Sequence, residues 1–84
     1  MLNRVSRKIR IALEGFDESG MTYWMVRATL RDGRVFSNVF ITDSWGLGFP
    51  DLCPFQAADI VEVEWEGHRA NKHSGVPVLV RDDG

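Results

Sequence analysis

The sequence predicts an all-β fold, namely a small antiparallel barrel or sandwich of five strands with SH3-like or OB-like architecture. One observation is an Asp-Gly dipeptide between two β-rich runs, which is typical of a hairpin turn. A second is the alternation of apolar and polar residues in two further short segments, 7–14 and 59–66. The 84 residues suit one domain spanning 1–84, and so short a chain has a shallow core.

The clearest element is a β-hairpin over residues 21–43, with Asp32 and Gly33 as its two turn residues. A two-residue turn pairs Leu30 with Val35 and sets the rest of the register. The face toward the core then holds Trp24, Val26, Ala28, Leu30, Val35, Ser37, Val39 and Ile41. The opposite face holds Tyr23, Met25, Arg27, Thr29, Phe36, Asn38, Phe40 and Thr42. That second set is half apolar, which is more than a solvated face requires.

Three other segments are expected to complete the sheet. Arg7–Glu14 alternates and predicts a half-buried strand, joined to the hairpin by turn residues at 15–20. Residues 59–66 alternate in the same way. Residues 76–81 predict the last strand, where Pro77 indicates an edge position or a strand start.

The connection over residues 43–58 is unusually long for a loop without structure. It contains three large aromatic residues, Trp45, Phe49 and Phe55. Pro54 suits the first position of a short helical turn. Two arrangements are open: the loop covers Phe36 and Phe40 on the second hairpin face as a minor core, or part of this aromatic surface stays exposed for a partner.

Composition argues against several classes of function. A single cysteine excludes an intrachain disulfide framework, and no run of about 18 apolar residues exists, so we expect a cytoplasmic protein with no membrane segment. Cys53 lies in an apolar stretch, where packing is more common than catalysis. Nothing in the sequence fixes His68 and His73 as metal ligands. We therefore expect no enzyme activity, no metal and no cofactor.

Charge disfavours nucleic acid as the main partner. The net charge is −2, with seven Lys/Arg against four Asp/Glu in the first 42 residues and three against eight in the rest. Nucleic-acid-binding domains usually show a basic patch or a basic stripe. Single-stranded nucleic-acid binding through aromatic and basic residues of the hairpin face remains the second interpretation.

The sequence thus predicts a non-enzymatic domain that binds a larger protein, as an adaptor or accessory subunit or as a small inhibitor of bacterial or phage type. A structural homodimer is a further alternative, so the chain is expected to be a monomer or a homodimer. The expected partner-binding residues are Tyr23, Arg27, Phe36, Phe40, Trp45 and Phe49. A second group that would contact an anion or a partner is His68, Arg69, Lys72 and His73.

Overall fold

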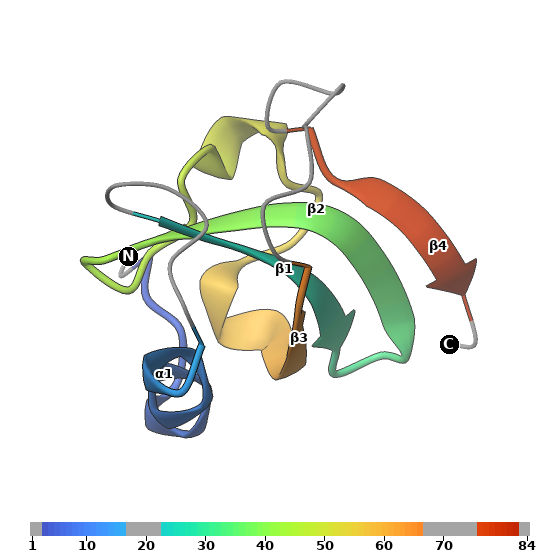
Figure 1. The fold of residues 1–84 in the computed structure, drawn as a ribbon. Helices are drawn as coiled ribbons and strands as arrows, with labels where there is room; N and C mark the ends of the chain where they lie inside the picture. Colours follow the sequence, from blue (N-terminus) through green and yellow to red (C-terminus); the bar gives the residue numbers. More distant parts are fainter. Residues whose placement is uncertain (1–2, 17–22, 67–75, 83–84) are drawn as a thin grey trace.

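A computed structural model describes residues 3–16, 23–66 and 76–82. In chain order the elements are α1 (Arg7–Glu14), β1 (Tyr23–Leu30), β2 (Arg34–Thr42), the 3₁₀ turns η1 (Pro50–Leu52) and η2 (Ala57–Asp59), β3 (Ile60–Trp65) and β4 (Val78–Asp82) (Figure 1). The strands form one open antiparallel sheet in the order β3-β1-β2-β4. The mostly β character is confirmed, whereas closure into a five-stranded barrel is not.

The segment Arg7–Glu14, expected as a strand, is the helix α1. The apolar residues of this segment fit both the two-residue period of a strand and the 3.6-residue period of a helix. The residues that reach the core are Val5, Ile9 and Leu13, whose spacing of four is helical. Ile11, which a strand would place beside them, is 60% exposed. Ser6 caps the helix by accepting a hydrogen bond from the Ile9 N–H at 3.4 Å. The expected fifth strand is therefore replaced by a helix that covers the sheet.

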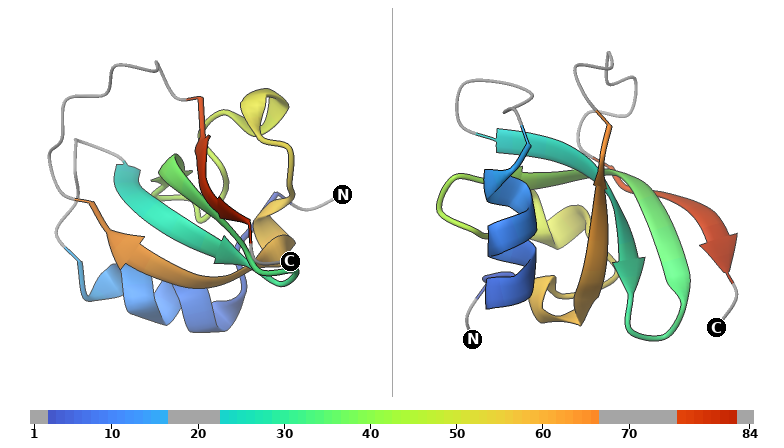
Figure 2. Two further views of the ribbon diagram at one scale, coloured as in Figure 1. Left: turned by 90° about the vertical axis from the view of Figure 1, so that its right-hand side faces the viewer. Right: turned by 60° about the horizontal axis from the view of Figure 1, so that its bottom comes forward.

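One face of the sheet, here called the core face, carries α1 and η2 side by side (Figure 2). The buried side chains of the sheet and of the segments covering it form one cluster. Its members are Val5, Ile9, Leu13, Trp24, Val26, Ala28, Leu30, Phe36, Val39, Ile41, Leu47, Phe55, Ala57 and Ile60. The opposite face of the sheet is here called the second face; Met25 and Phe40, which pair with each other, lie on it.

The predicted hairpin exists, and its register is confirmed from the Tyr23↔Thr42 pair to the Val26↔Val39 pair. Nearer the turn the prediction is wrong by one residue, because the turn has three residues, ending at Gly33 with φ 98°. A bulge between Val26 and Ala28 compensates for the extra turn residue. Phe36 consequently pairs with Ala28 and lies on the core face, although the two-residue turn places it on the second face.

The bulge places Ser37 and Asn38 opposite the single residue Arg27. Asn38 has φ 64°, a left-handed conformation that asparagine tolerates better than most residues. The Glu66 carboxylate accepts hydrogen bonds from the Asn38 N–H at 2.9 Å and the Ser37 hydroxyl at 2.6 Å. The Asn38 amide donates to the Val76 carbonyl at 2.9 Å. These contacts connect the end of β3 and the residues before β4 to the bulge in β2.

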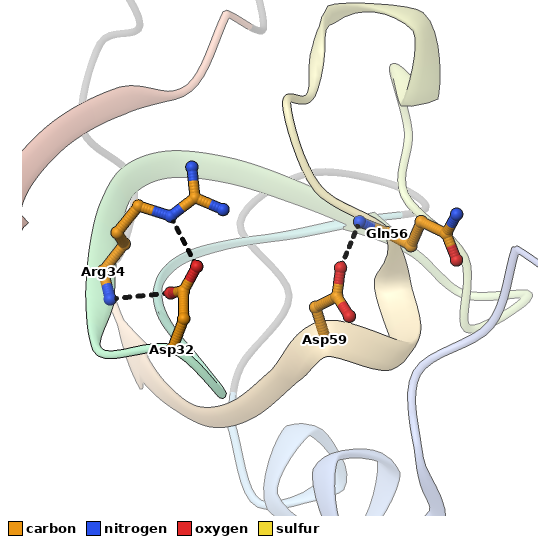
Figure 3. Close-up of polar contacts among 4 residues, drawn as sticks. All are labelled: Asp32, Arg34, Gln56 and Asp59. Atoms are coloured by element: carbon orange, nitrogen blue, oxygen red, sulfur yellow. Dashed lines mark hydrogen bonds and ion pairs between the residues drawn. The ribbon is translucent and has the colours of Figure 1, made fainter. Parts of the chain in front are cut away.

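The hairpin turn is stabilised by its own charged residues (Figure 3). Asp32 accepts hydrogen bonds from the Arg34 N–H at 3.0 Å and from the Arg34 Nε at 2.8 Å. The backbone N–H of Arg34, followed by its guanidinium, holds the pKa of the Asp32 carboxyl below its ordinary value. Figure 3 also shows Asp59 accepting from the Gln56 N–H at 3.0 Å, which caps η2.

The long connection contacts both Phe36 and Phe40, but not on one face as the covering arrangement expected: Phe49 packs against Phe40 on the second face, and Phe55 packs against Phe36 on the core face. Trp45 stacks on Trp24 with ring centroids 5.3 Å apart, and Phe55 lies 5.0 Å from Phe36, both on the core face. The helical turn expected to begin at Pro54 is displaced, since the 3₁₀ turns begin at Pro50 and Ala57.

The helical assignment predicts unequal effects for the same substitution at two isoleucines. Ile9→Val should lower the free energy of unfolding by about 0.5–1.5 kcal/mol, because it removes a buried methylene from the core. Ile11→Val should change it by less than about 0.5 kcal/mol, because Ile11 is exposed. Urea denaturation followed by tryptophan fluorescence measures both, and equal losses would support a strand instead.

Candidate docking surfaces

The structure separates the six expected partner-binding residues into two groups. Phe36 is buried in the core, and Trp45 is half-buried between Trp24 and the guanidinium of Arg10, whose carbon lies 5.0 Å from the ring centroid. Trp45 also has φ 71°, which is costly for a bulky side chain. Phe36 and Trp45 therefore act mainly in packing. The other four residues lie on or beside the second face.

Three of those four form an aromatic cluster, here called the aromatic strip: Tyr23, Phe40 and Phe49. The ring centroids of Tyr23 and Phe40 are 4.9 Å apart, and those of Phe40 and Phe49 are 5.6 Å apart in an edge-on arrangement. Phe49 is 43% exposed, while the other two are half-buried. The strip thus ends in an aromatic ring that solvent reaches.

Gly48 explains why a loop residue lies so close to β2. Its N–H donates to the Phe40 carbonyl at 2.8 Å, and a Cβ at this position would lie 3.2 Å from the Phe40 Cβ. The missing side chain allows the loop backbone to approach the strand. Phe49, the next residue, is thereby held against the Phe40 ring.

Arg27 belongs to a different part of the second face. Its Nε lies 3.5 Å from the Glu66 carboxylate, and its side chain is 42% exposed. Arg27 borders a hollow of about 490 Å³ that extends from Glu62 and Glu64 on β3 to Val80 and Arg81 on β4. The structure therefore does not join Arg27 to the aromatic strip. The other expected group, His68, Arg69, Lys72 and His73, lies outside the described residues.

The structure assigns physical roles to the thiol and to two of the carboxylates in the described residues. Burial raises the pKa of the Cys53 thiol to about 11, so the thiol is protonated at neutral pH, and its Sγ donates to the Phe49 carbonyl at 3.4 Å. Asp32 is hydrogen-bonded to Arg34 within the hairpin turn, and Asp59 caps η2. Residues 3–16, 23–66 and 76–82 contain no group of three histidine, cysteine or acidic side chains arranged to hold a metal ion.

Sequence reasoning missed a second exposed apolar surface, on β4. Leu79 and Val80 are 49% and 45% exposed, and Val76 just before the strand is 43% exposed. The signal was present in the sequence, because residues 78–80 are apolar without alternation and follow a proline typical of an edge strand.

Comparison with known proteins gives no assignment. No protein-family model matches the chain, and neither a curated protein nor a solved structure shows significant similarity to it. Within the described residues, no helix has the length and apolar character that crossing a membrane requires.

The raised pKa of Cys53 predicts slow reaction with thiol reagents. With a pKa of about 11 in place of 9.0, the thiolate fraction at pH 7.5 is about 100-fold lower than that of an ordinary cysteine. Burial disfavours the charged form, so the rate should rise about tenfold per pH unit until the pH approaches this pKa. Ellman's reagent measures the rate in native protein and in urea; equal rates would contradict the burial of the thiol.

Proposed function

We propose that this protein is a non-enzymatic binding domain that docks on a larger protein through the aromatic strip. The observation that carries the proposal is the continuous contact of Tyr23, Phe40 and Phe49, with Phe49 43% exposed. Aromatic side chains are enriched at the centres of protein interfaces, since they supply a large contact area and lose little conformational entropy. The proposed role is that of an adaptor, an accessory subunit or a small inhibitor.

Two features support docking over a purely structural role for Phe49. Its ring packs edge-on against Phe40 and is absent from the core cluster, so the fold does not depend on full burial of this side chain. The backbone contact of Gly48 with Phe40 also holds the ring in place before any partner arrives. A preorganised anchor loses less entropy on binding.

Phe49→Ala should abolish partner binding and lower the free energy of unfolding by less than about 1 kcal/mol, because the ring is nearly half exposed. Leu52→Ala is the matched control, since Leu52 is an apolar residue of similar exposure, 44%, in the adjacent turn η1 and is not one of the three aromatic residues of the strip. Affinity capture from the native host, with quantitative mass spectrometry, compares both variants with wild type.

The proposal requires that one protein is captured in stoichiometric amount by wild type and by Leu52→Ala. Phe49→Ala should fail to capture the same protein. Equal retention by all three proteins would contradict docking through the strip. A titration with single-stranded DNA at low salt, followed by tryptophan fluorescence, examines the alternative. Salt-sensitive binding that Phe49→Ala abolishes would replace the protein partner with nucleic acid.

A further inference from the structure

The sheet ends in two strands of opposite character. In the described part of the chain, β3 and β4 each pair with one neighbour, β1 and β2 respectively. An outer strand presents backbone N–H and C=O groups that another strand can pair with, and proteins commonly block this pairing with charged residues. The side chains on each edge strand therefore decide whether that strand can pair with another chain.

Strand β3 carries charges that oppose self-association. Glu62 and Glu64 are exposed on the same face of the strand. In an antiparallel pair of two β3 strands centred on Val63, Glu62 of each copy faces Glu64 of the other. Like charges directly opposite one another are destabilising. Pairing of β3 with β4 of another molecule would set these glutamates against apolar side chains and would also generate open-ended chains.

Strand β4 has the reverse character. Its first three residues, Val78, Leu79 and Val80, read the same in both directions, and the last two of them are nearly half exposed. Leu79 lies opposite Phe36 in register and so shares the core face. Val80 is the extra residue of a bulge in β4, because Leu79 and Arg81 pair with the neighbouring residues Phe36 and Val35. It lines the hollow on the second face. Neither face of this edge carries a charge between residues 76 and 80.

We propose that β4 pairs with β4 of a second copy of this chain, antiparallel and centred on Leu79. In this register Leu79 faces its counterpart, and Val78 faces Val80. Leu79 lies on the core face in both molecules, so the core faces of the two sheets are on the same side. Arg81 and Asp82 then lie opposite Pro77 and Val76, so no like charges meet. The result is a two-fold dimer with a continuous sheet and a core extended through Leu79.

The predicted dimer is weak and reversible. Two strands of five residues bury far less than the roughly 1,600 Å² of a standard interface. We therefore expect a Kd on the order of tens of micromolar or weaker. The aromatic strip is a separate surface, so this inference does not rest on the proposed docking function.

Sedimentation equilibrium of the full chain over a wide concentration range tests the proposal. Wild type should show concentration-dependent dimerisation, and Leu79→Lys should weaken it about tenfold or more, because two lysines would face each other across the two-fold axis. Ile11→Lys is the matched control, since Ile11 is 60% exposed on α1 and the added charge is the same. Circular dichroism verifies that each variant is folded.

A wild-type protein that stays monomeric at millimolar concentration would overturn the proposal, as would a dimer that Leu79→Lys leaves intact. A second variant, Leu79→Cys in a Cys53→Ser background, keeps the test decisive if the lysine variant fails to fold. Oxidation should link its two copies, whereas Ile11→Cys in the same background should remain uncrosslinked. Equal crosslinking of the two cysteine variants would contradict pairing through β4.

Discussion

The side chain of Glu66 extends across β1 and holds the bulge at Ser37 and Asn38 in β2. This bulge decides whether the side chains between it and the hairpin turn lie on the core face or on the second face. The carboxylate accepts the Asn38 N–H and the Ser37 hydroxyl, and its side chain is only 6% exposed. Without an acceptor, a buried N–H costs about 1–3 kcal/mol. The bulge and its acceptor are therefore best understood as one unit.

The bulge determines which aromatic residues stabilise the fold and which face the solvent. It turns Phe36 onto the core face, where the ring meets Phe55. Beyond the bulge, away from the hairpin turn, the strands keep the register predicted from the sequence. Phe40 therefore stays on the second face beside Tyr23. One extra residue thus divides the aromatic side chains of β2 between the core and the aromatic strip.

The sequence was sufficient for the hairpin, for β3 and for an edge strand after Pro77, since alternation and turn chemistry are local signals. The sequence was insufficient to predict α1, because the apolar residues of this segment fit the period of a strand as well as that of a helix. Val5 and the cap at Ser6 were the signals that favour a helix. The bulge could not be predicted, because its acceptor, Glu66, is distant in sequence. For the same reason, the sequence could not show that Phe36 lies on the core face while Phe40 lies on the second face.

The central claim is that Glu66 holds the bulge, and the free energy of unfolding of two matched variants tests it most directly. Glu66→Ala should cost about 2–4 kcal/mol, because it leaves the buried Asn38 N–H without its acceptor and the Arg27 guanidinium without the carboxylate 3.5 Å away. Glu64→Ala, an exposed glutamate on the same face, should cost less than about 0.5 kcal/mol. Equal, small losses in both variants would contradict the account.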